Sequence, residues 1–167
     1  MARIIDENFE GTGYEETWTE IVGAGCTLDE DSAIPGTPPP GASSQCLKAI
    51  SAATGYEAYA LRNYGSLKAK TFTRIYAYIG AEGLVNDSAK NICFAYDASS
   101  NGVWILLLYQ TAAGALQFVF YLWNNGTWNA YFSSNISLST WYRIEIKYDD
   151  TANTWEWKLN GTSQNSG

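Results

Sequence analysis

The sequence predicts an all-β protein, a two-sheet antiparallel sandwich of the jelly-roll type. About a dozen short stretches are rich in strand-forming residues, and several of them alternate apolar with polar side chains, the two-residue period of a strand with one buried face. Gly, Asn and Asp separate these stretches, as turn residues do, and no stretch has the period of an amphipathic helix. Many short strands with frequent turns are typical of two stacked antiparallel sheets.

The N-terminal part is predicted to contain two strands and a long loop. The strands are expected at residues 3–9 and 18–22. The next segment, residues 23–44, contains Asp29-Glu30-Asp31 and all four prolines of the chain. Because proline cannot donate a ladder hydrogen bond, we expect an exposed loop over this whole segment. A plain surface loop is one interpretation, and a stiff contact arm is the other.

The middle of the chain supplies most of the strands. Asn124-Asn125-Gly126-Thr127 is the strongest hairpin signal in the sequence. The stretch before it, residues 116–123, is apolar on both of its faces, so it is buried on both sides or presents aromatic rings to a ligand or partner. The strands are expected at residues 45–50, 57–61, 69–79, 90–96, 103–110, 116–123 and 128–133.

A hairpin is predicted near the C-terminus. Residues 141–148 alternate apolar with charged side chains, and residues 155–159 do so again after a short acidic turn. The second stretch ends at Asn160-Gly161, a pair that favours the two positive φ angles of a type I′ turn. We therefore expect two antiparallel strands and a further reversal of the chain through Thr162-Ser163.

Two stretches resemble a known family. The strand Trp141-Tyr142-Arg143-Ile144-Glu145-Ile146, its acidic turn and the aromatic strand that closes on Leu159-Asn160-Gly161 resemble the late hairpin of laminin-G-like jelly-roll domains, within the concanavalin A-like lectin/glucanase superfamily. Residues 5–15, IDENFEGTGYE, resemble the first strand and loop of small bacterial and phage members. The two stretches bracket most of the chain, so the resemblance implies a single jelly-roll domain over residues 1–167.

The resemblance also implies a calcium site. In related jelly rolls an ion joins the loop after the first strand to a late strand through carboxylate and backbone oxygens, the ligands that hard cations prefer. Glu10, Gly11 and Glu15 would supply the first half of this site. The late acidic strand that would complete it is missing, because the sequence stops six residues after Gly161. An ordinary acidic loop is the alternative.

Aromatic residues are the candidates for ligand binding. In a jelly roll they would line the concave sheet, where flat rings stack on the apolar faces of sugars. Packing in the core is the alternative for each of them, because aromatic side chains contribute mainly through buried area. The candidates are Tyr76, Tyr78, Trp104, Tyr121, Trp123, Trp128 and Tyr131.

The three cysteines, Cys26, Cys46 and Cys93, have no metal-ligand spacing. Cys93 lies in a strand-like run, where we expect a buried thiol. Cys26 and Cys46 flank a loop, and two interpretations stay open for them. They form a disulfide, which would stabilise the fold by about 3 kcal/mol, or they are two thiols.

The composition argues against several classes of protein. The net charge of −7 repels phosphate backbones, so we expect no nucleic-acid binding. The longest apolar stretch, residues 103–109, is too short to span a bilayer, so we expect no membrane insertion. A signal peptide is not visible, and the four Asn-x-Ser/Thr sequons are attributed to the abundance of Asn and Thr.

Catalysis is not expected either. The chain contains no histidine, which removes His-dependent nucleophilic sites and His-ligated zinc. The Glu-x-Asp-x-Glu motif of related glucanases is absent, because Lys147 stands between Glu145 and Asp149 where the second acid is needed. Asp29-Glu30-Asp31 is expected on a solvated loop, with poor control of the carboxyl separation. The Gln-Ile-His element of the lyase members is also absent.

Two functional classes remain, with a polysaccharide-degrading enzyme a distant third. The first is a structural or decoration-type module of a phage particle or other extracellular assembly, with protein neighbours as its partners and a glycan as a further contact. The second is a secreted carbohydrate-binding module, whose partner is a polysaccharide. Both place the protein outside the cell or on a virion surface.

The two ends of the sequence carry a separate expectation. The N-terminal strand of such jelly rolls pairs with a last strand that returns after the late hairpin. Residues 162–167 are polar, so they could begin a return strand but not complete an apolar one. We therefore expect either that the natural chain continues beyond Gly167, or that a neighbouring copy covers the Ile4-Ile5 edge by strand addition, which would make a homo-oligomer.

Overall fold

The computed structural model describes residues 18–32, 36–37, 46–50, 58–61, 69–80, 83–97, 102–124 and 126–167. The regular structure in these ranges is entirely β-strand, which confirms the all-β prediction. No helix in them has the length and apolar character needed to cross a membrane. The chain divides into two compact units, residues 1–66 and 67–167. Whether both belong to a single domain stays a prediction.

The first unit contains two antiparallel strand pairs, β1 with β4 and β2 with β3. The second pair corrects the expected loop over residues 23–44, because β2 lies inside it. Asp29 is directly opposite Lys48 in the ladder, and opposite charges at facing positions favour the pairing. Leu28 is buried. The four strands are β1 (Thr19–Val22), β2 (Thr27–Asp31), β3 (Cys46–Ile50) and β4 (Ala58–Leu61).

The same register settles the cysteine question. Cys46 pairs with Asp31 at one end of the β2–β3 ladder, whereas Cys26 precedes Thr27 at the other end. A disulfide needs Cα atoms within about 7 Å of each other. No disulfide joins Cys26 to Cys46, so the interpretation as two thiols is confirmed.

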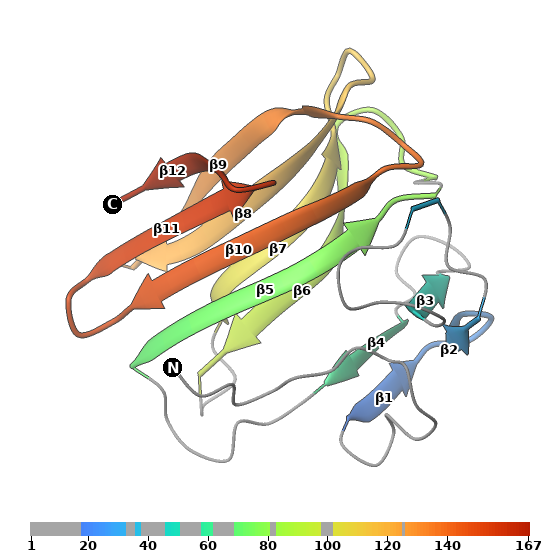
Figure 1. Cartoon of the computed structure of the whole chain (residues 1–167), viewed down its shortest axis with the longest axis horizontal. Helices are drawn as coiled ribbons and strands as arrows, with labels where there is room; N and C mark the ends of the chain where they lie inside the picture. The colour runs from blue at the N-terminus through green and yellow to red at the C-terminus, as the bar shows by residue number, and fades with distance from the viewer. Residues whose placement is uncertain are drawn as a thin grey trace. The chain divides into compact units, whose positions relative to one another are not determined.

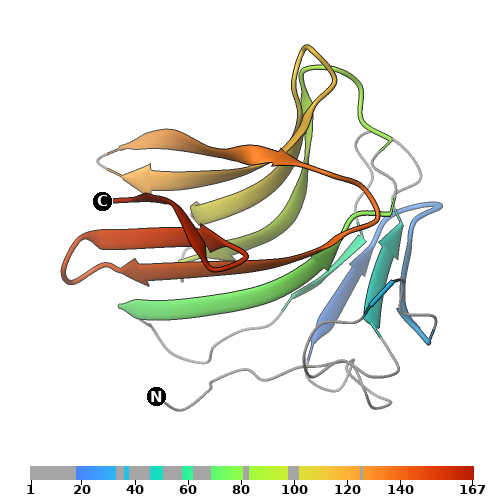
Figure 2. The ribbon, with the colours of Figure 1, turned by 45° about the horizontal axis from the view of Figure 1, so that its top comes forward.

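The second unit is a sandwich of two four-stranded antiparallel sheets (Figure 1). One sheet has the order β12-β11-β10-β5 and the other has the order β6-β7-β8-β9. Figure 2 shows the two layers from a second direction. The strands are β5 (Lys70–Tyr78), β6 (Ser88–Tyr96), β7 (Gly102–Gln110), β8 (Leu116–Asn124), β9 (Thr127–Ile136), β10 (Trp141–Asp149), β11 (Thr154–Leu159) and β12 (Thr162–Ser166).

The core fills the space between these two sheets. Phe120 of β8 is its centre, with ring centroids 5.7 Å from Trp155 and 6.0 Å from Trp157 of the opposite sheet. Phe118 meets Tyr142 edge-on at 5.4 Å. Offset and edge-on ring pairs add stability beyond the area that they bury. Aromatic contacts at the centre, together with aliphatic side chains such as Leu106 and Ile144, therefore join the two sheets.

The C-terminal hairpin agrees with the sequence pattern and extends beyond it. Asn160 and Gly161 have φ angles of 51° and 84°, which confirms the predicted turn. Residues after the turn form β12, which pairs with β11, and Gly167 exchanges two backbone hydrogen bonds with Trp155. These polar residues thus complete a strand, because an edge strand needs backbone pairing and not apolar side chains. The predicted strand at residues 3–9 lies outside the described residues.

Replacing a buried tryptophan should cost far more than replacing an exposed one. Trp157 is 0% exposed and Trp123 is 44% exposed. We expect Trp157→Ala to lower the free energy of unfolding by about 3–5 kcal/mol, because it leaves a cavity between the sheets. Trp123→Ala should lower it by about 1 kcal/mol or less. Urea unfolding of both variants measures the difference, and equal losses would contradict this description of the core.

Candidate functional site

The strands of the β6–β9 sheet are apolar on both faces. On β8 the side chains of Phe118, Phe120 and Leu122 point into the core, so those of Tyr121 and Trp123 point to the opposite side. The same holds for β7, whose Trp104, Leu106 and Leu108 are buried in the core. The sheet therefore has a second apolar face, which we call the β6–β9 outer face.

Large hydrophobic side chains remain exposed on this face. Trp128 is 38% exposed and Phe132 is 50% exposed. Tyr109 contacts Phe132 edge-on, with ring centroids 5.8 Å apart. A soluble domain rarely leaves such side chains contiguous unless the patch binds something. The face is made of Ile105, Leu107, Tyr109, Val119, Tyr121, Trp123, Trp128 and Phe132.

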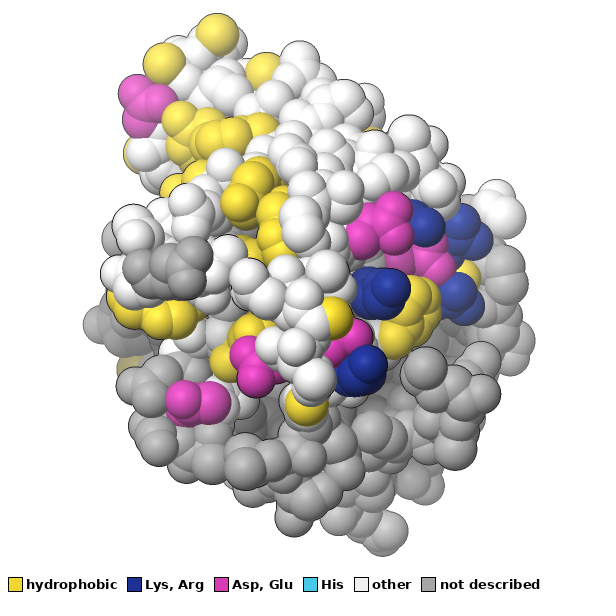
Figure 3. Space-filling view, turned by 90° about the vertical axis from the view of Figure 1, so that its left-hand side faces the viewer, with side chains coloured by type: hydrophobic (Ala, Val, Ile, Leu, Met, Phe, Trp, Pro, Cys, Tyr) yellow, Lys and Arg dark blue, Asp and Glu magenta, His cyan; other side chains and the backbone are white. Residues whose placement is uncertain are grey.

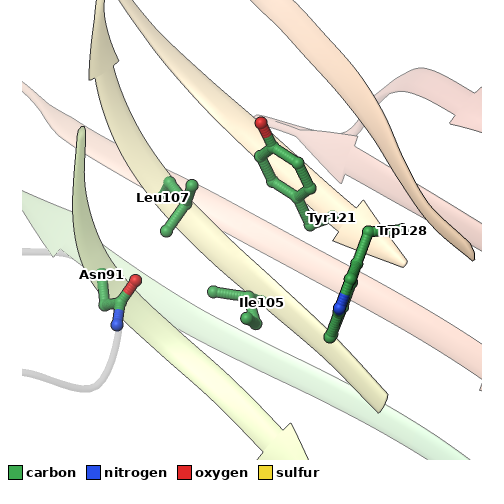
Figure 4. Close-up of a pocket in the computed structure, with 5 residues that line it drawn as sticks. All are labelled: Asn91, Ile105, Leu107, Tyr121 and Trp128. Atoms are coloured by element: carbon green, nitrogen blue, oxygen red, sulfur yellow. The ribbon is translucent and has the colours of Figure 1, made fainter. Parts of the chain in front are cut away.

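A shallow pocket of about 310 Å³ lies on this face. Figure 4 shows its five lining side chains, which come from four neighbouring strands and rise from the same side of the sheet. Its polar groups are the amide of Asn91, the hydroxyl of Tyr121 and the indole N–H of Trp128, among apolar walls. A mainly apolar lining with a few polar groups is typical of binding sites. The lining residues are Asn91, Ile105, Leu107, Tyr121 and Trp128.

Trp128 is held in place by two neighbours. A Cβ atom at Gly102 would lie 2.7 Å from the indole ring of Trp128, so the absence of a side chain at Gly102 makes room for the ring. On its other side Trp128 meets Trp123 edge-on, with ring centroids 5.4 Å apart. The indole is therefore positioned by the protein itself.

The structure divides the seven predicted aromatic residues into three groups. Tyr121, Trp123 and Trp128 lie together on the β6–β9 outer face, and their role in ligand binding stays a prediction. For Trp104 and Tyr131 the prediction is corrected, because Trp104 is only 2% exposed in the core and Tyr131 packs against the core, 4.3 Å from the ring of Trp155. The third group, Tyr76 and Tyr78, belongs to β5 in the other sheet.

The reason for the error at Trp104 is the run of residues 103–109, which is apolar throughout. Alternation cannot show which half of such a run faces inward, so Trp104 could be assigned to either face. Sequence reasoning also missed Asn91, Ile105, Leu107 and Phe132. Paired residues on neighbouring strands point to the same side of the sheet. Ile105 and Leu107 could therefore be found from their β8 partners Tyr121 and Val119.

Two potentially nucleophilic groups on the described strands favour their protonated forms. Burial raises the pKa of the Cys93 thiol to about 11, so it is protonated at neutral pH. The Tyr109 hydroxyl donates a hydrogen bond to the Asp87 carboxylate at 2.8 Å, which raises the pKa of Tyr109. No three acidic, Cys or His side chains among the described residues are grouped as metal ligands. The predicted calcium ligands Glu10, Gly11 and Glu15 lie outside these residues.

Comparison with protein-family models, curated proteins and solved structures finds no match for this chain.

The Cys93 thiol should react slowly in the folded protein. The thiolate is the reactive form, and a pKa of about 11 leaves less of it than in the unfolded chain. At neutral pH we expect iodoacetamide to alkylate Cys93 about 100-fold more slowly in the native state than in guanidinium. The native rate should rise as the pH approaches 11. Mass-spectrometric peptide mapping separates Cys93 from the other cysteines, and rapid native alkylation at neutral pH would contradict its buried position.

Proposed function

We propose that this chain is a non-catalytic structural module of an assembled surface, such as a phage particle or another extracellular assembly. The observation that carries the proposal is the β6–β9 outer face, which offers its neighbour a broad apolar surface. The partner that suits it is a protein subunit with a matching apolar surface. Laminin-G-like jelly rolls, which the sequence resembles, provide a scaffold for this role without catalytic residues.

The composition of the face favours a protein neighbour over a sugar. Aliphatic side chains such as Ile105 and Leu107 line the pocket beside the aromatic rings. Aliphatic groups pack well against another protein but have no flat surface for a sugar ring. Aromatic residues at the centre of a patch are also typical of protein interfaces.

The face is prepared for docking before a partner arrives. Val119, which belongs to it, is only 1% exposed. Trp128 is fixed by Gly102 and Trp123. Since ordering side chains opposes association, a face that is already packed binds at a lower entropic cost.

A secreted carbohydrate-binding module is the second candidate, and the pocket is the observation that favours it. Tyr121 and Trp128 line the pocket beside Asn91. Two aromatic rings near an amide are able to stack on a sugar and bind its hydroxyl groups. The small share of polar groups in the lining is why this candidate comes second.

Fractionation of the native source tests the proposal. We expect the chain to co-migrate with a particle or polymer on a density gradient. Phe132→Ser should release the chain to the top of the gradient, because it removes an exposed apolar contact from the β6–β9 outer face. Phe72→Ser is the matched control, since Phe72 is similarly exposed, 53% against 50%, but lies in the other sheet. It should leave co-migration unchanged.

Three outcomes would contradict the proposal. A monomer that migrates alone and is retained on a neutral polysaccharide would favour the second candidate instead. Equal release by Phe132→Ser and Phe72→Ser would show that the β6–β9 outer face is not the specific contact. Release of reducing ends or unsaturated products from a polysaccharide, abolished by replacing one carboxylate, would show an enzyme.

A further inference from the structure

The other sheet carries a face of different chemistry. On β10 and β11 the side chains of Ile144, Ile146 and Trp157 point into the core, so the charged residues between them point outward. Five of the ten basic residues of the chain lie on this side of β5, β10 and β11, together with three acidic ones. We call it the β5–β11 outer face, and its charged residues are Lys70, Arg74, Arg143, Lys147, Lys158, Glu145, Asp149 and Glu156.

This basic excess is local. The whole chain has a net charge of −7, and ten of its 17 acidic residues belong to residues 1–66. Charges more than about 10 Å away are largely screened at 0.1 M salt. A ligand close to the β5–β11 outer face is therefore influenced mainly by the residues of that face. Figure 3 shows Lys or Arg side chains beside Asp or Glu, with hydrophobic atoms among them.

Two arginines on this face share one carboxylate. Arg74 donates from Nε and Nη2 to Oε1 of Glu145, at 2.9 Å and 2.7 Å. The Nε atom of Arg143 is buried 3.4 Å from Oε2 of Glu145 and has no hydrogen-bond partner, so a ligand would contact the terminal nitrogens of this guanidinium. A guanidinium has five N–H donors, and one carboxylate neutralises only one positive charge. The pair therefore keeps a positive charge and unused donors, on side chains that are 45% and 39% exposed.

Aromatic rings border the two arginines. Tyr76 is directly opposite Arg143 in the β5–β10 ladder. Two pairs further along the ladder, the rings of Tyr78 and Trp141 lie 5.3 Å apart. On the other side the Arg74 guanidinium lies over the ring of Phe72, 5.7 Å from its centroid. Neighbouring strands are about 4.8 Å apart. Charged side chains and aromatic rings on this face are therefore close enough to contact the same ligand.

We infer that the β5–β11 outer face binds an acidic polysaccharide, a chain of sugar rings that carry carboxylate or sulfate groups. Guanidinium groups bind such anions through paired, charge-assisted hydrogen bonds, and the adjacent aromatic rings offer flat surfaces to the sugars. An acidic polysaccharide with one charge on each sugar ring has a much lower charge per unit length than duplex DNA, which carries one charge per about 1.7 Å. The modest basic excess of this face suits the less dense polymer.

The simpler account is that the charges only stabilise the sheet. Exposed ion pairs contribute about 0–1 kcal/mol each, so such a role predicts small stability changes and no ligand. Arg143 distinguishes the two accounts. Its replacement by glutamine leaves Glu145 paired with Arg74 at 2.7 Å, so the sheet keeps its stronger ion pair while the unused donors are lost.

Polygalacturonate is the probe, and its methyl ester is the matched control polymer, since it has the same backbone without the charges. In isothermal titration calorimetry at 0.1 M salt, where the distant acidic residues are screened, we expect wild-type protein to bind polygalacturonate and not the ester. Arg143→Gln should weaken binding at least about fivefold. Arg143→Lys keeps the charge without the planar fork, so we expect an intermediate affinity. Lys90→Gln removes one charge from the other sheet and should change the affinity less than twofold.

Several results would overturn the inference. These are equal binding of the acid and the ester, unchanged affinity in Arg143→Gln with an unchanged melting temperature, and binding of single-stranded DNA without binding of polygalacturonate. If heparin binds and polygalacturonate does not, sulfate is the recognised group. The β6–β9 outer face is independent of this test, because Phe132→Ser should keep polygalacturonate affinity, so either proposal can fail without the other.

Discussion

The burial of aromatic rings between the two sheets is the constraint on which the rest of the structure depends. Phe120 contacts Trp155 and Trp157 across the sandwich, and these contacts fix which half of each strand faces inward. Because side chains alternate strictly along a strand, a shift of one residue would exchange the two faces. The core therefore also decides what the protein presents to its surroundings.

The two outward faces that result differ in how they are stabilised. On the β6–β9 side the residues are mainly apolar, and Val119 among them is buried. On the β5–β11 side, ion pairs cross the strands, and Asp149 lies 2.9 Å from Lys70. Lys70 and the backbone amide of Ala152 lower the pKa of Asp149. That interaction stabilises the fold above the ordinary carboxyl pKa and is lost on acidification.

Strands with regular alternation were predictable from the sequence. In β10 and β11 the charged residues mark the outward half unambiguously, and the Asn160-Gly161 turn fixes the hairpin between β11 and β12. In β7 every residue from Val103 to Tyr109 is apolar, so alternation does not show which side chains face the core. For this reason the predicted face of Trp104 is wrong. Only the tertiary packing distinguishes the two halves of such a strand.

Other features depended on pairing that local patterns do not show. The sequence pattern does not reveal the acidic strand β2, because nothing in Thr27–Asp31 alternates clearly and its partner β3 supplies the stabilising contacts. The pocket combines residues of β6, β7, β8 and β9. Asn91 and Trp128 are 37 positions apart in the sequence, so no local motif joins them. The sequence also does not show that two arginines share the carboxylate of Glu145, because Arg74 is 71 positions away in the sequence, on the neighbouring strand β5.

A sandwich of this kind is able to use both faces at once. Stacked sheets lie about 10 Å apart, and the core between them is closely packed, so a ligand on one face does not block the other. Close packing also limits how far a surface substitution disturbs the opposite sheet. An apolar face suited to attachment and a basic, aromatic face suited to an acidic polymer are therefore compatible in one module. The two faces lie on opposite sides of the sandwich because alternate side chains of each sheet point into the core between them.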